Sequence, residues 1–318
     1  MKIIGTGSYL PNGIVNNDDL AKIVDTSDEW IYTRTGIKER RISTGMENSE
    51  MAIEAARHAL NNSGIDKEQI DLIIVATVSS DYATPSLACI VQGALEIPDA
   101  VAFDINAACS GFIYALNTAY CYMNTGGIRN ALVIGSETLS KITDYEDRST
   151  CVLFGDAAGA VVIQADRDAL YHCKIGTDGS KAQVIHCKQA PLSNILVKKD
   201  SKLGYIHMDG QEVYKFVLRV IPNLIKKVVK EANLGMKDIS YFILHQSNLR
   251  MNEAIAKKLR QGIEKFPCNL EGTGNTSSAS VPVLLDEVNK QGKLNKGDKI
   301  VLCSFGGGLT WAAIVLEW

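Results

Sequence analysis

The chain has 318 residues, of which 46% are hydrophobic, and this is enough for one large core or for two units of ordinary domain size. Its formal net charge of −3 argues against strong binding to a polyanion such as nucleic acid. No run of roughly eighteen apolar residues occurs, so we expect no membrane span, and the first residues predict a strand and not a signal peptide. The 8 cysteines lack CxxC spacing, which favours reduced thiols. We therefore expect a cytoplasmic globular protein.

Apolar, β-branched segments alternate with helical patterns along the chain. Buried strands are predicted at 2–8, 72–76, 131–135 and 299–303. Amphipathic helices are predicted at 49–61 and 213–232. This alternation predicts an α/β fold whose sheets are covered by helices.

The two halves of the sequence resemble each other. KIIGTGS begins at Lys2 and KIGTDGS begins at Lys174, while the strand that starts at Leu72 has a counterpart at Phe242. The offsets nearly agree, since 174 − 2 = 172 and 242 − 72 = 170. We therefore predict a duplicated α/β unit, with halves at 1–170 and 171–318, whose loops meet at one central site.

The strongest candidate nucleophile is Cys109, within the segment NAACSG at 106–111. A strand-like segment ends before these small residues and a helical pattern begins at about Ser110, so Cys109 is predicted at the N-terminus of a helix. Unpaired amides and the helix dipole at that position favour the thiolate, which is the nucleophilic form of cysteine. A buried structural thiol is the alternative interpretation.

Three positions in the second half are further candidates. His245 ends the strand at 241–244, where α/β sheets place their ligands, although a surface-loop histidine fits the same pattern. Asn275 lies near the repeat position of Cys109, since 275 − 109 = 166, but it also suits an ordinary Gly/Ser/Asn loop. Gly307 lies in a run of three glycines whose amides could stabilise an oxyanion or simply form a tight turn.

Several other kinds of site are not supported. The segment Gly5-Thr6-Gly7 lacks the third glycine of a dinucleotide fingerprint, and neither a Walker A motif nor GxSxG occurs. The pairs His172–Cys173 and His186–Cys187 match no common zinc spacing, so we expect no metal.

A set of motifs occurs in order from one end of the chain to the other: GTGSYLP at 5–11, DTSDEWI at 25–31, RTGI at 34–37, FGDAAGA at 154–160, HQSNLR at 245–250, GNTS at 274–277 and GGGLTW at 306–311. In this order and spacing they resemble the β-ketoacyl-acyl carrier protein (ACP) synthase III family. The resemblance implies the thiolase fold, in which two duplicated α/β halves form a five-layered αβαβα architecture. It also implies a homodimeric condensing acyltransferase of fatty-acid biosynthesis that needs no metal or other cofactor.

The same resemblance implies a role for each candidate. Cys109 takes an acyl group from acyl-CoA, while His245 and Asn275 bind the carbonyl of malonyl-ACP and stabilise the enolate formed as CO2 leaves. The enolate attacks the acyl-cysteine, whose oxyanion is held by the amides of Cys109 and Gly307, and the product is 3-oxoacyl-ACP. Loss of CO2 generates the carbanion without a strong base, so neutral or cationic donors are needed more than a carboxylate.

Binding residues are implied in the same way. Positions that contact CoA in the family are occupied here by Trp30 and Arg148, which flank the adenine, and by Thr26, Arg34, Gly210 and Asn248. The basic surface that docks ACP corresponds to Lys215, Arg250, Lys257 and Lys258. Thr84 stands where many acetyl-specific members carry phenylalanine at the end of the partner subunit's acyl pocket. We therefore expect a deeper pocket and starters that are longer or more branched than acetyl-CoA.

Some positions depart from the family pattern and affect the details of CoA binding: Leu244, Ser149, Gln211 and Tyr214. Others argue against related chemistries, because Asn275 replaces the second histidine of elongating synthases, Val78 replaces the glutamate base of hydroxymethylglutaryl-CoA synthases, and Ser304 replaces the second cysteine of degradative thiolases. Two alternatives stay open: a synthase III-like enzyme of a secondary-metabolite pathway, and a non-catalytic scaffold that binds CoA or ACP.

Overall fold

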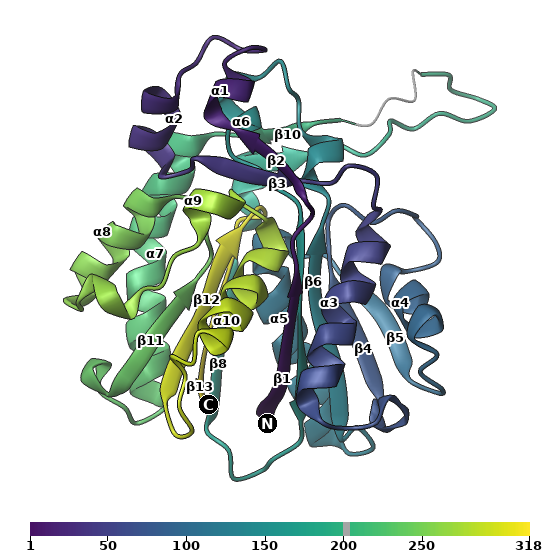
Figure 1. Cartoon of the computed structure of the whole chain (residues 1–318), viewed down its shortest axis with the longest axis vertical. Helices are drawn as coiled ribbons and strands as arrows, with labels where there is room; N and C mark the ends of the chain where they lie inside the picture. The colour runs from purple at the N-terminus through teal and green to yellow at the C-terminus, as the bar shows by residue number, and fades with distance from the viewer. Residues whose placement is uncertain (200–203) are drawn as a thin grey trace.

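Two mixed β-sheets form the centre of the computed structural model, which describes residues 1–199 and 204–318 (Figure 1). The first sheet has the strand order β1 (Lys2–Tyr9), β7 (Ala157–Gln164), β6 (Asn130–Glu137), β4 (Leu72–Ala76) and β5 (Val101–Ile105). The second has the order β11 (Ile239–Leu244), β12 (Lys299–Gly306), β13 (Thr310–Glu317) and β8 (Tyr171–Thr177). The strands predicted at 2–8, 72–76, 131–135 and 299–303 are thus confirmed.

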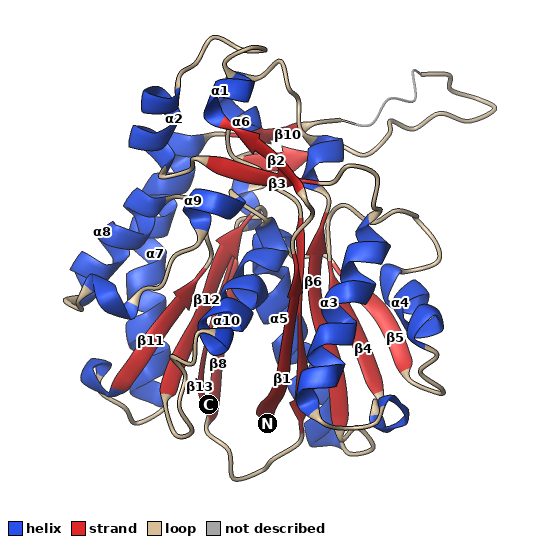
Figure 2. Cartoon of the chain, viewed as in Figure 1, coloured by secondary structure: helices blue, strands red, loops and turns tan. Residues whose placement is uncertain are grey.

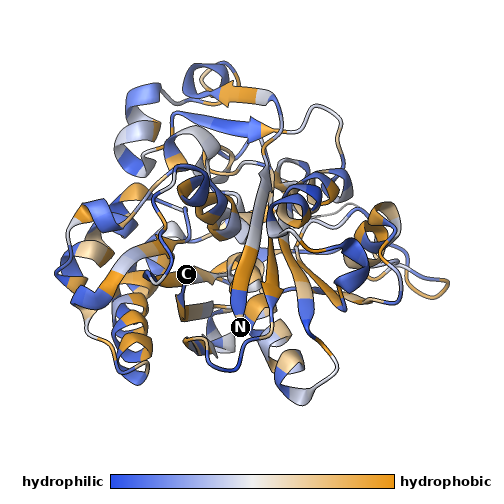
Figure 3. Ribbon diagram, turned by 60° about the horizontal axis from the view of Figure 1, so that its bottom comes forward, coloured by the Kyte–Doolittle hydropathy of each residue, from blue (hydrophilic) through white to orange (hydrophobic). Residues whose placement is uncertain are grey.

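Helices fill the space between the two sheets and cover their outer faces, which gives five layers (Figure 2). The central layer is α5 (Gly111–Thr125) and α10 (Ser280–Lys290), whose apolar side chains share one core with both sheets. The outer helices are α3 (Asn48–Ser63) and α4 (Leu87–Leu95) on the first sheet and α7 (Gly210–Glu231) and α8 (Leu249–Leu259) on the second. Figure 3 shows the strands largely in the orange of hydrophobic residues, as expected for sheets buried on both faces.

The close approach of α3 to β1 accounts for the glycines in the N-terminal motif GTGS. A side chain at Gly7 would place its Cβ 2.4 Å from the carbonyl oxygen of Ala55, and one at Gly5 would lie equally close to that of Ala59. The alanine-rich buried face of α3 therefore packs directly on the backbone of β1. These glycines serve packing between a helix and a strand.

The duplication predicted from the sequence is present in the strand topology. The order β1-β7-β6-β4 in the first sheet corresponds to β8-β13-β12-β11 in the second, and in both sheets the pairings are antiparallel, antiparallel and parallel. Strand β5 adds a parallel edge to the first sheet alone. A domain boundary near residue 170 stays a prediction, and this position lies in the loop between β7 and β8.

The match extends to the short turns that lead into the central helices. The 3₁₀ turns η2 (Ala108–Ser110) and η7 (Ser277–Ala279) precede α5 and α10, and each begins with a left-handed residue, φ 47° at Ala108 and 48° at Ser277. The offset is constant, since 277 − 108 = 169 and 280 − 111 = 169. The residue equivalent to Cys109 is therefore Ser278, three positions beyond the approximate match at Asn275.

Shorter elements form a cap beside the C-terminal ends of β11 and β12 (Figure 1). They are β2 (Gly13–Asn16), β3 (Glu39–Ile42), β9 (Ile185–Cys187), β10 (Ile206–Met208), α1 (Asn17–Leu20), α2 (Asp28–Thr35), α6 (Arg148–Cys151) and α9 (Leu270–Thr273). The remaining 3₁₀ turns are η1 (Lys67–Gln69), η3 (Leu139–Ile142), η4 (Gly179–Lys181), η5 (Met236–Asp238) and η6 (Ile263–Lys265). The cap and the strand ends together enclose the candidate site.

Candidate active site

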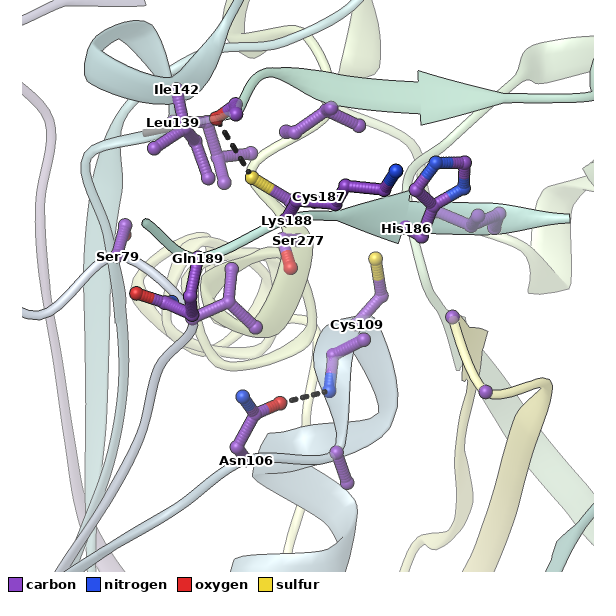
Figure 4. Close-up of a pocket in the computed structure, with 18 of the residues that line it drawn as sticks. Ser79, Asn106, Cys109, Leu139, Ile142, His186, Cys187, Lys188, Gln189 and Ser277 are labelled. Carbon is purple, nitrogen blue, oxygen red and sulfur yellow. Dashed lines mark hydrogen bonds between the residues drawn. The ribbon is translucent and has the colours of Figure 1, made fainter. Parts of the chain in front are cut away.

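Cys109 lies in the turn η2 between β5 and α5, as the sequence predicts. The half-buried thiol projects into a cavity of about 500 Å³ (Figure 4). The cavity is lined from both halves of the chain, by η2 and residues near Ser79 on one side and by Ser277, Gly307 and the strand β9 on the other. This position gives a ligand direct access to the thiol.

The end of β12 presses against the backbone of Cys109. A Cβ at Gly306 would lie 2.7 Å from the amide nitrogen of Cys109, so only glycine fits there. The Ser304 hydroxyl donates to the carbonyl oxygen of Cys109 at 2.6 Å. Next along the chain, the Gly307 amide has no acceptor within the described part of the chain, and Gly307 lines the cavity. An unpaired amide beside the nucleophile is what an oxyanion site requires.

The environment of Cys109 does not favour the thiolate, which differs from the expectation based on the helix N-terminus. Burial raises the pKa of the Cys109 thiol to about 11, and the nearby carboxyl of Glu137 adds to this rise. The Ser277 side chain opposes this rise in the pKa without cancelling it. The resting nucleophile is therefore a protonated thiol, and its proton must be removed during any reaction at sulfur.

His245 follows β11 and is buried, with 1% of its surface exposed. Its backbone N–H donates to Cys303, and its ring lies edge-on to Phe305 at 5.2 Å, so it is anchored on the strand that also contacts Cys109. Burial lowers the pKa of the His245 imidazole to about 3. The ring is therefore neutral at physiological pH.

The tautomer of His245 follows from its hydrogen-bond partner. The Ser280 hydroxyl lies 2.7 Å from Nδ1 and also accepts the backbone N–H of Gln246 at 3.1 Å. The backbone N–H of Gln246 can only donate, so it cannot accept the Ser280 hydroxyl hydrogen. Among the described residues, the acceptor for this hydrogen is therefore Nδ1 of His245. Nδ1 therefore accepts, and Nε2 carries the hydrogen as a neutral donor.

Asn275 has a similar division between a fixed end and a free end. The side-chain Oδ1 of Asn275 accepts the backbone N–H of Ser277 at 2.9 Å. The backbone N–H of Asn275 donates to the carbonyl of Leu153. No acceptor in the described part of the chain takes its Nδ2 hydrogens. Because Oδ1 is held by the backbone, the amide orientation is fixed and Nδ2 remains a donor for a ligand.

The three side chains and Gly307 are held by neighbouring elements, and His245 and Asn275 are not among the described residues that line the cavity. Ser304 and Gly306 of β12 touch Cys109, and the same strand anchors His245. Ser277 donates its backbone N–H to Asn275 and lines the same cavity as Cys109. The arrangement offers a thiol nucleophile, two neutral donors and unpaired amides. Such a set is suited to thioester exchange and to stabilising negative charge on an oxygen.

Sequence reasoning missed the polar groups that support this set. Ser280 is hydrogen-bonded to His245, and Ser277 is hydrogen-bonded to Asn275 through its backbone N–H. Glu137 is fully buried at the end of β6 and accepts hydrogen bonds from Ser79 and Ser278. A carboxylate directly after a buried strand was the available signal for Glu137, since polar groups at strand ends mark sites in α/β folds.

The predicted CoA residues lie mainly in the cap. The indole of Trp30 is contacted by Arg34, 4.6 Å from guanidinium carbon to ring centroid, and by Arg148, 4.9 Å away. Asn248 caps α8 and donates to the carbonyl of Arg34 at 2.9 Å. The Thr26 hydroxyl is buried and has no partner among the described residues. The sixth residue, Gly210, begins α7 in open space.

The four predicted ACP-docking residues are all exposed on the adjacent helices α7 and α8. Lys215 is on α7 and pairs with Glu212 at 2.9 Å, so its charge is partly neutralised. The others are on α8 and include Lys258, which donates to the carbonyl of Leu218 on α7 at 2.8 Å. Arg219 of α7, which the sequence did not single out, lines a small depression together with Lys215.

Thr84 does not join this site. It is exposed in the loop before α4, and it is not among the described residues that line the cavity around Cys109. The described part of the chain contains no group of three His, Cys, Asp or Glu side chains arranged to hold a metal. A search of the same residues for a helix of the length and hydrophobicity that a membrane crossing requires found none.

Comparisons with known proteins show which family the chain resembles. Family models described as 3-oxoacyl-[acyl-carrier-protein (ACP)] synthase III and its C-terminal part match residues 103–179 and 229–318. The chain is 50% identical to β-ketoacyl-[acyl-carrier-protein] synthase III of Clostridium acetobutylicum, with 100% of this chain and 98% of that protein covered.

Solved structures lead to the same family. The 3-oxoacyl-[acyl-carrier-protein] synthase III of Aquifex aeolicus is 45% identical, with a TM-score of 0.93 over 100% of this chain and 99% of the other. The priming β-ketosynthase of the R1128 polyketide pathway is 33% identical, with a TM-score of 0.93 over 99% and 95%. Its identity to these relatives over its whole length shows that the chain belongs to the β-ketoacyl-ACP synthase III family, with the thiolase fold.

Proposed function

We propose that this enzyme transfers an acyl group from acyl-CoA to Cys109 and condenses it with malonyl-ACP, releasing CO2 and giving 3-oxoacyl-ACP. One observation carries the proposal: Cys109 opens into a cavity, and the elements that pack on its turn, β12 and η7, lie next to two fixed neutral donors, His245 Nε2–H and Asn275 Nδ2. The two functions needed for condensation, a nucleophile and an enolate-stabilising pair, are therefore held on neighbouring elements.

The first half-reaction is transfer of the acyl group to Cys109. The thiol attacks the thioester carbonyl, and the negative charge develops on the carbonyl oxygen. The amide of Gly307 is unpaired, and together with the amide of Cys109 it supplies donors for that oxygen. The CoA sulfur then leaves and takes up the proton that the Cys109 thiol has lost, and the acyl group stays on the cysteine as a thioester.

The second half-reaction is decarboxylation of the malonyl group. Loss of CO2 places negative charge on the malonyl thioester oxygen, where His245 Nε2–H and Asn275 Nδ2 donate to it. Both groups are neutral, so they stabilise the enolate without protonating it and the carbon remains nucleophilic. That carbon attacks the acyl-cysteine carbonyl, and Cys109 is the leaving group. The chemistry requires no metal and no resident cofactor.

The nucleotide of CoA is proposed to bind at Trp30. In the structure the Arg148 guanidinium occupies one face of the indole and donates to the carbonyl of Asp25 at 2.7 Å. An aromatic base would insert between Trp30 and Arg148, because both present flat π or cationic faces. Arg148 is exposed and can move away. The unpaired hydroxyl of Thr26 is an additional polar partner nearby in the cap.

The carrier protein is proposed to dock on the basic surface of α7 and α8, formed by Lys215, Arg250, Lys257 and Lys258. Carrier proteins are acidic, so complementary charge would raise the association rate and fix the orientation of the complex. Lys257 and Lys258 also lie in the last turn of α8, a position that the helix dipole favours for cations.

The enzyme is proposed to be a cytoplasmic homodimer that pairs along β5. This strand is the edge of the first sheet, and apolar side chains beside it are exposed, with 47% of Val101 and 41% of Tyr122 accessible. Asp104 of β5 also holds the start of α4 by accepting the amides of Leu87 and Ala88. Pairing of two copies there would bring the Thr84 loop of one subunit toward the other.

A secondary-metabolite pathway remains the second candidate, because the priming ketosynthase of the R1128 polyketide pathway has the same TM-score as the Aquifex enzyme. Its lower identity, 33% against 45%, favours the fatty-acid role. The complete set of Cys109, His245 and Asn275 argues against a non-catalytic scaffold. Intact-protein mass spectrometry after incubation with a panel of acyl-CoAs tests the proposal.

The expected result is one acyl adduct, located on Cys109, that disappears when malonyl-ACP is added and 3-oxoacyl-ACP forms. Cys109→Ala should lose both half-reactions. His245→Ala and Asn275→Ala should still be acylated but lose decarboxylation by about 10²- to 10³-fold, since each removes one enolate donor. Normal condensation by either of these two variants would contradict the assignment.

A further inference from the structure

Arg219 is an exposed cation of α7 that the docking surface proposed above does not include. The described part of the chain offers its guanidinium no carboxylate within ion-pair distance and no hydrogen-bond acceptor. An exposed and unpaired guanidinium keeps all its N–H donors free for a partner. Its surroundings indicate which kind of partner it would bind.

The guanidinium stands at a hollow of about 160 Å³ beside α7. Three cations line this hollow, Lys181 of η4 and Lys215 and Arg219 of α7, together with one carboxylate, that of Glu212. Positions 212, 215 and 219 are spaced by three and four residues, so their side chains lie along one stripe of the helix. The hollow therefore has an excess of positive charge.

Glu212 pairs with the two lysines of the hollow and leaves the arginine free. Its Oε1 lies 2.9 Å from Lys215 Nζ, and its Oε2 lies 3.5 Å from Lys181 Nζ. The hydrogen bond from Lys215, with a smaller contribution from Lys181, lowers the pKa of the Glu212 carboxyl, so it is ionised at physiological pH. Asp178, which precedes η4, is hydrogen-bonded to Ser180. The positive charge that remains available is that of Arg219.

The size and walls of the hollow favour a protein side chain over a free small molecule. Pockets that take small-molecule ligands have volumes of about 300–1,000 Å³, and this hollow is smaller. Its apolar walls are Val184, Phe216 and Leu309. These walls suit the methylene groups of an acidic side chain, and the planar fork of an arginine matches a carboxylate through two parallel hydrogen bonds.

The hollow adjoins the surface proposed for the carrier protein. Lys215 belongs to both, and α8 is joined to α7 beside it, because Lys258 donates to the carbonyl of Leu218, the residue before Arg219. A protein that covers Lys215 and the basic residues of α8 would therefore also cover the hollow. The partner that this position and this charge fit is an acidic protein surface.

We propose that the hollow takes a carboxylate side chain of the acidic carrier protein and that Arg219 is its main ligand; this rests on the proposed function. Glu212 occupies the lysines in the free enzyme, so Arg219 is the cation that is ready to pair on first contact. The pair gives the carrier protein a fixed point on the side of Lys215 that faces away from α8. Two separated anchors define the orientation of a docked protein better than one.

The test compares KM for malonyl-ACP among variants of the full-length, acylated enzyme. Arg219→Ala should raise this KM about two- to fivefold, the effect of one exposed ion pair, and the difference from wild type should shrink at high salt. Glu212→Gln should lower the same KM, because it removes the negative charge that now occupies both lysines. A supporting role in the fold would not produce opposite signs in these two variants.

Lys230→Ala is the matched control, because it removes one cation from the last turn of the same helix. Since 230 − 219 = 11, it lies about 16 Å along the helix from Arg219, beyond the screening length of about 8–10 Å, and should match wild type. Malonyl-pantetheine lacks the carrier protein, so Arg219→Ala should decarboxylate it at the wild-type rate. Acylation by acyl-CoA should also be unchanged, which shows that the variant is folded.

Equal KM values for malonyl-ACP in Arg219→Ala and Lys230→Ala would overturn the carboxylate site. A higher KM in Glu212→Gln would do the same, and so would a rise in KM for acyl-CoA in Arg219→Ala as large as that for malonyl-ACP. Failure of the wild type to condense an acyl group with malonyl-ACP would instead overturn the proposed function.

Discussion

The Ser280 hydroxyl lies 2.7 Å from Nδ1 of His245 and thereby fixes which ring nitrogen carries the hydrogen. Ser280→Ala should therefore let the imidazole change tautomer and should slow malonyl decarboxylation at least about tenfold, as loss of an oriented donor does. Acylation of Cys109 should stay within a few-fold of wild type. Ser280→Thr keeps a hydroxyl and should recover part of the rate. Equal decarboxylation by Ser280→Ala and wild type would show that Ser280 does not set the tautomer.

The buried imidazole also affects stability at low pH. The pKa of His245 is lowered to about 3 in the folded protein, below its unfolded value of 6.5, so the unfolded chain binds the proton more readily. The stability that neutral His245 contributes is present above pH 6.5 and is lost as the pH falls toward 3. His245→Asn should therefore show a weaker loss of stability over this interval in denaturant titrations. An identical slope in both proteins would contradict the lowered pKa.

Trp30 should matter for the nucleotide part of CoA. Trp30 is half-buried, and Trp30→Ala removes a stacking contact of about 0.5–1 kcal/mol, so KM for acyl-CoA should rise roughly two- to fivefold. Acyl-pantetheine thioesters, which lack the nucleotide, serve as the control and should be used equally well by both proteins. Trp30→Phe keeps an aromatic face and should lie between them. A similar rise in KM for both thioesters would place the role of Trp30 elsewhere.

Charge reversal on α8 tests the docking surface. Arg250→Glu and Lys257→Glu should raise KM for malonyl-ACP and make it less dependent on salt, because an attractive charge pair becomes repulsive. The rate of acylation by acyl-CoA should not change, since the carrier protein takes no part in that step. Lys293→Glu, outside α8 and in a turn after α10, is the matched reversal. If all three variants respond alike, net charge and not this surface controls the effect.

Thr84 tests both the starter preference and the dimer. Each methylene buried in a deeper pocket gains up to about 0.8 kcal/mol, so wild type should prefer starters longer or more branched than acetyl-CoA. Thr84→Phe should penalise those starters and leave acetyl-CoA nearly unchanged. Light scattering should give a dimer mass for both proteins. Exclusive use of acetyl-CoA by wild type, with no effect of Thr84→Phe, would refute the pocket argument.

The fold, and the positions of Cys109 and His245 within it, were predictable because their signals are local. Cys109 follows a strand and precedes a helix within a few residues, and His245 ends an apolar strand, so short patterns were enough to place them. The duplication was visible as a repeated motif at nearly constant offset. Such features depend on backbone elements and not on which side chains meet across the molecule.

The supporting contacts were not predictable for the same reason. Ser280 reaches His245 from 35 residues away, and Ser278 reaches Glu137 from 141 residues away, across the two halves. The acidity of Cys109 also went against expectation, because burial and the Glu137 carboxyl outweigh the helix terminus. Desolvation depends on how closely two sheets pack, and no local pattern reports it.

The constant offset between the halves has an evolutionary consequence. Cys109 and Ser278 are equivalent, and so are Glu137 and Gly306, because 278 − 109 = 169 and 306 − 137 = 169. An ancestor built from two identical halves would have carried two equal reaction centres. At one, Gly306 leaves room for the cysteine backbone; at the other, a carboxyl fills the space and binds a serine hydroxyl. The second centre, formed by Ser278 and Glu137, no longer catalyses a reaction of its own. Its residues instead support the centre that contains Cys109.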